Sequence, residues 1–107
     1  MRGDLVTIAM QGDFGKPRPA VIVQSNHFIH HPTVSVLLVT SKVVNAPLLR
    51  ITLEPNETNG LEHPSQVMID KIMTVRREKI GAAFGRVDNN VLMQIDRTLA
   101  VFLGIAK

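Results

Sequence analysis

The order of apolar and polar residues divides the chain into a strand-rich part, residues 1–87, and one C-terminal helix. Residues 1–87 contain short apolar runs bounded by residues typical of turns, which is the pattern of β-strands. The predicted strands are Asp4–Met10, Arg18–Gln24, Thr33–Thr40, Leu48–Leu53, Ser65–Val75 (as one long strand or two short ones) and Gly81–Val87. The nearly continuous apolar runs at 18–24 and 33–40 predict buried strands, as in a sheet buried on both faces or in a small barrel.

The hydrophobic period changes after residue 87. Apolar residues then recur at helical spacing, at Val91, Leu92, Ile95, Leu99, Phe102 and Leu103. Asp88 precedes them and is a favoured N-cap, so we expect an amphipathic helix from Asp88 to about Leu103. Short, evenly spaced strands followed by one helix predict a mainly-β fold, a small and strongly bent barrel with the helix packed on it.

The length and composition indicate one globular domain, residues 1–107, whose 45% hydrophobic content is enough for a core. No apolar run approaches the roughly 20 residues that cross a bilayer, and no apolar signal region follows the first residues. We therefore expect a soluble cytoplasmic protein without a membrane partner. The absence of cysteine excludes disulfides and thiolate chemistry.

Positive charge is concentrated in residues 71–86. This segment carries five cations against one acid, a net +4, whereas the whole chain nets +3. The excess favours a polyanionic partner, although a solvated face has the same composition. Four phenylalanines with no tyrosine or tryptophan argue against a broad base-stacking platform and leave recognition of a few nucleotides in a small pocket.

Lys16-Pro17-Arg18-Pro19 places an arginine between two prolines at the start of a buried strand. Each proline fixes its own φ and biases the preceding residue towards extended geometry. The guanidinium of Arg18 is then a stiffly held donor fork suited to phosphate or carboxylate. The same tetrapeptide also fits a proline-marked strand start with a solvated arginine.

Four histidines are the remaining candidates for metal or proton chemistry. His27, His30 and His31 fall together in a loop, His63 lies apart, and no acidic or cysteine ligand has a suitable spacing. The pattern predicts a surface loop rather than a metal site or a catalytic pair. We expect no metal and no other cofactor.

Five segments in order resemble the MazF/PemK toxins of toxin–antitoxin systems over nearly the full length. They are Arg2-Gly3-Asp4, the glycine-containing loop leading to Arg18-Pro19-Ala20-Val21-Ile22-Val23, Val39-Thr40-Ser41 at a strand end, Ile72-Met73-Thr74-Val75, and the terminal helix. The resemblance implies a metal-independent endoribonuclease on an SH3-like antiparallel barrel. It also implies a homodimer that binds single-stranded RNA in a groove along its interface, and a cognate antitoxin whose disordered tail occupies that groove.

Metal-free RNA cleavage needs a base for the ribose 2′-OH, donors for the phosphate and an acid for the 5′-oxygen, and gives 2′,3′-cyclic phosphate and 5′-OH ends. Arg18 matches the family's catalytic arginine, and because arginine is a poor acid we favour an electrostatic role for it. Thr40 matches the family's strand-end threonine, whose hydroxyl can bond the phosphate or the 2′-OH, as can that of Ser41. The alternative for Thr40 is an ordinary strand residue.

Asp70 is the candidate base, because it interrupts an apolar run and burial would move its pKa towards the useful range. The alternative is a turn residue between two strands. Two positions where relatives carry arginine are Met68 and Met73 here, which leaves the proton donor open.

Other expected RNA contacts lie in the loop Gln11–Lys16, which offers the carboxylate of Asp13, the ring of Phe14 and the charge of Lys16. Lys42 and Lys71 are expected to contact the RNA backbone. A different hypothesis is a gyrase poison like CcdB, which shares this fold and uses a C-terminal Trp-Gly-Ile. The chain has Leu103-Gly104-Ile105 there and lacks the tryptophan.

Overall fold

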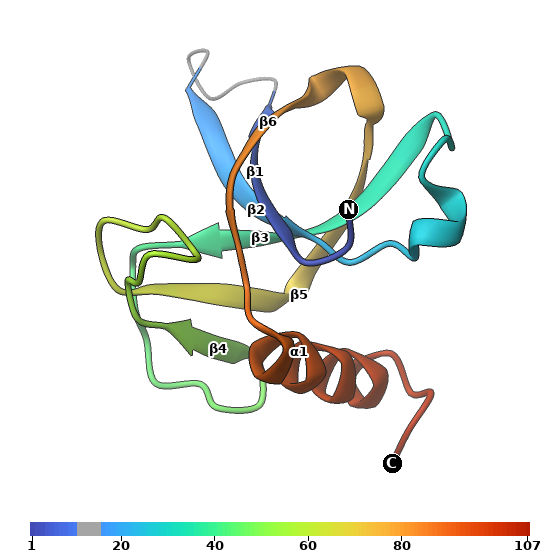
Figure 1. Cartoon of the computed structure of the whole chain (residues 1–107). Coiled ribbons are helices and arrows are strands. Elements are labelled where there is room, and N and C mark those ends of the chain that lie inside the picture. The colour runs from blue at the N-terminus through green and yellow to red at the C-terminus, as the bar shows by residue number, and fades with distance from the viewer. Residues whose placement is uncertain (11–15) are drawn as a thin grey trace.

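The structure is a computed structural model that describes residues 1–10 and 16–107 (Figure 1). The elements are β1 (Asp4–Ala9), β2 (Pro17–Ile22), β3 (Thr33–Thr40), β4 (Arg50–Leu53), β5 (Ser65–Arg76), β6 (Ile80–Arg86) and α1 (Asn89–Phe102). Short 3₁₀ turns at Asn26–Phe28 and Arg77–Lys79 precede β3 and β6. Every predicted strand is present, with ends displaced by one or two residues, and 65–76 is one long strand.

The strands form one antiparallel sheet in the order β4-β5-β3-β2-β1-β6. The predicted mainly-β, strongly bent antiparallel fold with a C-terminal helix is confirmed, and its sheet is open, with β4 and β6 at the edges. The loop between β4 and β5 covers the β6 edge, because the Arg86 N–H donates to the Thr58 carbonyl at 3.0 Å. A Cβ on Gly85 would lie 2.2 Å from the Asn59 carbonyl oxygen, so only glycine permits this approach.

The bend of the sheet is greatest in β5. This strand pairs with β3 at Val39↔Val67 and again at Leu37↔Ile72, so residues 68–71 lie opposite Leu38 alone. Extra residues on one strand of a pair bend it and increase its twist. The first half of β5 therefore pairs with β4 and the second half turns away from it (Figure 1).

The sheet is buried on both faces in its centre, as the apolar runs predict. One face and α1 enclose the helix-side core, which consists of Leu5, Val21, Leu37, Val39, Ile51, Leu53, Val67, Ile69, Val87 and Ile95. Alternate residues of β1, β2 and β3 form the second core on the opposite face, which consists of Val6, Ile8, Ala20, Ile22, Val34 and Val36.

The helix begins as predicted, because the Asp88 carboxylate accepts a hydrogen bond from the Val91 N–H at 2.8 Å. Ile95 is fully buried against β4 and β5. The predicted apolar stripe packs only as far as Leu99, since Phe102 and Leu103 stay 45% and 49% exposed. Among the helices in the described ranges, none is long and apolar enough to cross a membrane.

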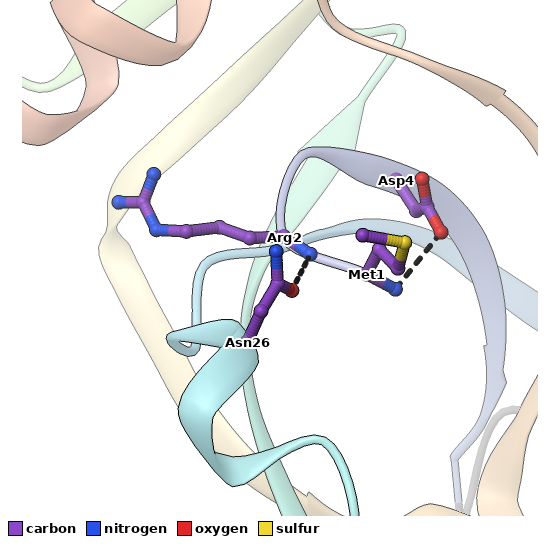
Figure 2. Close-up of polar contacts among 4 residues, drawn as sticks. All are labelled: Met1, Arg2, Asp4 and Asn26. Atoms are coloured by element: carbon purple, nitrogen blue, oxygen red, sulfur yellow. Dashed lines mark hydrogen bonds and ion pairs between the residues drawn. The ribbon is translucent and has the colours of Figure 1, made fainter.

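The first residues are fixed by polar contacts to distant parts of the chain. The Arg2 N–H donates to Asn26 Oδ1 at 2.8 Å, and the Met1 amine donates to Asp4 Oδ2 at 2.9 Å (Figure 2). The Arg2 guanidinium forms an ion pair with Asp96 of α1. This segment therefore joins β1 to the helix and has a structural role.

Candidate functional site

Arg18 and Thr40 lie at the same end of neighbouring strands. The last pairs of β2 with β3 are Val21↔Leu37 and Ala20↔Leu38, and continuing this register two residues past the last pair puts Arg18 and Thr40 in one row. Both positions alternate with residues of the helix-side core, so both side chains belong to the opposite face. Arg18 is exposed and Thr40 is half-buried. The structure thus brings together the two residues that the sequence made the main candidates.

The prolines around Arg18 fit this position. Pairing of β2 with β1 continues through Ile8↔Arg18 and Ala9↔Pro17, whereas pairing with β3 ends at Ala20. Proline has no N–H for a ladder bond, so a strand tolerates it where the pairing on one side has ended. Arg18 is consequently held in the sheet by β1.

The Thr40 hydroxyl has a defined orientation. Its Oγ1 accepts a hydrogen bond from the Lys42 N–H at 3.1 Å, so the hydroxyl proton is directed away from this turn. Ser41 and Lys42 follow as exposed residues at the start of the loop to β4. Thr40 can therefore donate to a ligand oxygen that lies over this face of the sheet.

Gln66 extends this row across β5 and was not identified from the sequence. It pairs with Thr40 on one side and Thr52 on the other and is 4% exposed. Its Oε1 accepts from the Val44 N–H at 3.1 Å, and its Nε2 donates to the Val44 carbonyl at 3.0 Å and to Thr52 Oγ1 at 3.1 Å. Gln66 therefore fixes the loop that carries Ser41 and Lys42.

Asp70 lies in the irregular part of β5. It alternates with Ile69 of the helix-side core and so belongs to the face that carries Gln66. The residue is half-buried, and its Oδ1 is buried without a hydrogen-bond partner in the described part of the chain. An unsatisfied buried acceptor costs about 1–3 kcal/mol, which points to a donor that arrives from outside.

A polar cavity of about 210 Å³ opens beside Gln66 and Thr52. Its wall includes residues 44–47 of the loop and Arg50 at the start of β4. Arg50 is half-buried and was also missed from the sequence, where it stands in an alternating strand and has the appearance of a solvated residue. Only the register of β4 and β5 shows that it shares the face of Thr40.

The remaining predicted contacts are distributed as follows. Lys16, Ser41 and Lys42 are exposed at the end of the sheet that carries Arg18 and Thr40. Lys71 is exposed and follows Asp70 in the irregular segment of β5. Asp13 and Phe14 fall outside the described residues.

The basic segment 71–86 does not form one surface with this site. Thr33↔Arg76 pairs the end of β3 opposite to Thr40. There Arg76 forms an ion pair with Glu78 at 3.3 Å, and Arg77 Nε donates to the His31 carbonyl at 2.8 Å. The charges of this segment therefore have different surroundings: Arg76 and Arg77 have partners at the Thr33 end of β3, whereas Lys71 follows Asp70 in β5.

Two other sequence features have local explanations. His27, His30 and His31 are exposed around the first 3₁₀ turn, and no group of three or more potential ligands is arranged for a metal within residues 1–10 and 16–107. Gly104, the centre of the segment that suggested a gyrase poison, has φ +78° and ends α1, and the next N–H donates to the Ala100 carbonyl at 2.8 Å.

The candidate site thus occupies the face of the sheet opposite α1. The face is apolar where the second core is buried and polar on β4, the first half of β5 and the end of β3. Its polar residues are Arg18, Thr40, Arg50, Thr52, Gln66 and Asp70. Cations, hydroxyls and a carboxylate on one face of a sheet can bind a phosphate and transfer a proton.

Known proteins match this chain over nearly its whole length. A family model described as PemK-like, MazF-like toxin of type II toxin-antitoxin system matches residues 1–103. The chain is 43% identical over 106 residues to a probable endoribonuclease MazF of Mycolicibacterium smegmatis, covering 98% of this chain and 97% of that protein.

Solved structures agree in fold. An endoribonuclease in complex with its cognate antitoxin from mycobacterial species matches with a TM-score of 0.83 at 23% identity, over 100% of this chain and 97% of that one. A chain of the MazE-MazF complex from Deinococcus radiodurans matches with a TM-score of 0.76 at 20% identity, over 98% and 96% of the two chains. On the family match and the 43% identity, this chain belongs to the PemK/MazF family of toxins of type II toxin–antitoxin systems.

Proposed function

We propose that the protein is a toxin endoribonuclease that cleaves single-stranded RNA without a metal ion. The observation that supports the proposal is the register of β2 and β3, which puts Arg18 and Thr40 in one row on the face opposite α1 when it is continued two residues past Ala20↔Leu38. The relative at 43% identity is itself described as a probable endoribonuclease. The proposed substrate is messenger RNA, and the proposed place of action is the cytoplasm.

The proposed reaction is attack of the ribose 2′-oxygen on the adjacent phosphorus. Asp70 accepts the 2′-OH proton, the new O–P bond closes a 2′,3′-cyclic phosphate, and the bond between phosphorus and the 5′-oxygen breaks. The 5′-oxygen takes a proton from solvent and leaves as a 5′-hydroxyl. The Arg18 fork stabilises the charge that develops on the phosphate, and the Thr40 hydroxyl donates to a phosphate oxygen. The buried Oδ1 of Asp70 and the Lys42 N–H on Thr40 Oγ1 support these two roles.

The lysines and the loop between β1 and β2 supply binding in this proposal. Lys16, Lys42 and Lys71 contact phosphates on either side of the cleaved bond, with Ser41 as a further donor. Asp13 and Phe14 are proposed to contact bases. Such contacts set the position and affinity of the RNA more than the rate of the chemical step.

The proposed assembly is a homodimer that a cognate antitoxin keeps inactive. Membership of a type II toxin family supports an antitoxin partner, and the structural match described as an endoribonuclease with its cognate antitoxin is such a complex. Light scattering of the purified toxin at micromolar concentration tests the dimer, and a monomer mass contradicts it.

The central experiment is cleavage of a long mixed RNA in EDTA, with fragment ends mapped by primer extension. Wild-type protein is expected to give discrete cuts with 5′-OH and 2′,3′-cyclic phosphate ends. Arg18→Ala is expected to abolish the cuts, and Arg76→Ala, at the other end of the sheet, is expected to keep them. Folded wild-type protein that leaves RNA intact but traps gyrase on DNA would overturn the proposal in favour of the gyrase poison.

A further inference from the structure

Arg50 combines three properties that the proposed reaction does not yet use. It alternates with Ile51 of the helix-side core, so its side chain belongs to the face of Thr40 and Gln66. It is half-buried and lines the polar cavity of about 210 Å³. Its guanidinium has no carboxylate within 4.0 Å among the residues that the structure describes.

The cavity beside Arg50 has a fixed wall. Gln66 holds both backbone groups of Val44, and the Arg50 N–H donates to the Ala46 carbonyl at 2.9 Å. The loop is therefore tied to the sheet on both sides of the cavity. A half-buried cation in such a setting suits an anion that enters from solvent, because the donors are positioned in advance.

We propose that Arg50 binds a backbone phosphate of the RNA next to the one that is cleaved, with the nucleotide lying over the cavity. The proposal rests on the ribonuclease function given above. β4 and β2 are separated by β5 and β3, and the row of Thr40 and Gln66 meets β4 at Thr52, two residues from Arg50. Measured along the sheet, Arg50 is therefore more than three strand spacings of about 4.8 Å from Arg18, which is at least about 14 Å. That separation assigns the two guanidinium groups to different phosphates of one strand.

Asp70 is the other possible partner for Arg50 on this face. Arg50 pairs with Met68, so Asp70 is its diagonal neighbour on the adjacent strand, and strand geometry places such positions about 7–8 Å apart. A long side chain can span this distance. An Arg50–Asp70 contact would change the protonation of the base rather than the affinity for RNA, so the two roles have different readouts.

The test measures binding separately from cleavage. Fluorescence anisotropy follows a short 2′-O-methyl RNA, which cannot be cleaved, on wild type, Arg50→Ala, Arg50→Lys and the control Arg76→Ala. Arg50→Ala is expected to weaken binding roughly fivefold. The slope of log affinity against log salt concentration is expected to become less steep by about 0.7, the value for one lost phosphate contact on a single strand. Arg50→Lys is expected to keep the slope, and Arg76→Ala to match wild type.

A second probe locates the phosphate. Replacing one linkage at a time with an uncharged methylphosphonate is expected to weaken wild-type binding at several positions. At one position beside the cleaved bond, the replacement is expected to weaken binding to wild type but to leave the affinity of the Arg50→Ala protein unchanged. Additive losses at every position would overturn the proposal, because the two changes would then act on separate contacts.

The outcomes separate this inference from the function on which it depends. Wild-type protein that cleaves RNA while Arg50→Ala binds with unchanged affinity and salt slope overturns the phosphate contact alone. A shifted pH–rate profile with unchanged affinity also overturns it and assigns Arg50 to Asp70. Wild-type protein that cleaves no RNA overturns the proposed function itself.

Discussion

Arginines lie near both ends of β3, but their surroundings differ. At the Thr33 end, Arg76 is paired with Glu78, and Arg77 donates to the carbonyls of Phe28 and His31. At the Thr40 end, Arg50 lines an open cavity without a carboxylate partner in the described ranges. The position of charges in the sequence therefore does not locate the site. The site is indicated by which charged side chains already have partners in the fold and which do not.

The difference extends to the carboxylates. Glu78 lies at the surface in an exposed ion pair, which contributes little to stability. Asp70 has a buried oxygen without a partner in the described part of the chain, which is unfavourable for the folded state unless a ligand supplies a donor. Polar groups that the fold leaves unsatisfied are the ones that a substrate can use.

Among the variants that test this contrast between the two ends, the largest effect is expected from Asp70→Asn. The substitution keeps the shape of the side chain and removes its capacity as a base, so the cleavage rate should fall about 10²–10⁴-fold. The free energy of unfolding should change little, because the side chain is half-buried and its buried Oδ1 has no hydrogen bond to lose in the described part of the chain. Single-turnover cleavage and thermal unfolding measure the two quantities, and a full rate with an unchanged pH profile would show that Asp70 is not the base.

Thr40→Val should reduce cleavage by about 10–100-fold, because one hydrogen bond to the developing charge is lost. The side chain keeps its volume and β-branching, so the fold should persist despite the loss of the Lys42 N–H bond. Thr33→Val at the other end of β3 is the matched control and should cleave at the wild-type rate. Equal rates for both variants would remove the Thr40 hydroxyl from the mechanism.

Gln66→Met should raise the RNA concentration needed for half-maximal cleavage several-fold, with a smaller change in the saturated rate. The substitution removes the bonds to Val44 and Thr52, so the loop that carries Lys42 is no longer fixed against the sheet. Each lost bond costs about 1 kcal/mol. Hydrogen exchange at the Val44 amide separates this role from general destabilisation, since it should quicken while amides of the helix-side core stay protected.

The strands and the helix could be predicted because they depend on local signals. Apolar runs marked β2 and β3, and Asp88 with the spacing to Ile95 marked α1. Arg18 could be identified as a candidate for the same reason, because the prolines on either side of it are a local signal. Asp70 was also a local prediction, because it interrupts an apolar run. The family resemblance added Thr40 as a candidate, and the position of Thr40 and Asp70 on one face came only from the structure.

Gln66 and Arg50 could not be predicted, because their importance depends on strand register. A shift of one residue moves a side chain to the other face of a sheet, and register is set by pairing between distant segments. The four residues of β5 that oppose Leu38 have no local sequence signal. The positive charge of residues 71–86 was misleading for a related reason, since hydrogen bonds to a distant loop decide what Arg77 does.

The smallest expected effect tests the structural end of β3. Arg77→Ala removes the side-chain donor of the His31 carbonyl and one of two side-chain donors of the Phe28 carbonyl, so the free energy of unfolding should fall by about 1–2 kcal/mol. Cleavage at a temperature where the variant is folded should equal that of wild type.

Arg76→Ala breaks only the exposed pair with Glu78 and should change stability by less than about 1 kcal/mol. Thermal unfolding and cleavage assays on both variants are the measurements. If Arg77→Ala instead lost cleavage while remaining fully folded, both ends of β3 would contact RNA, and the contrast between them would be one of strength rather than of role.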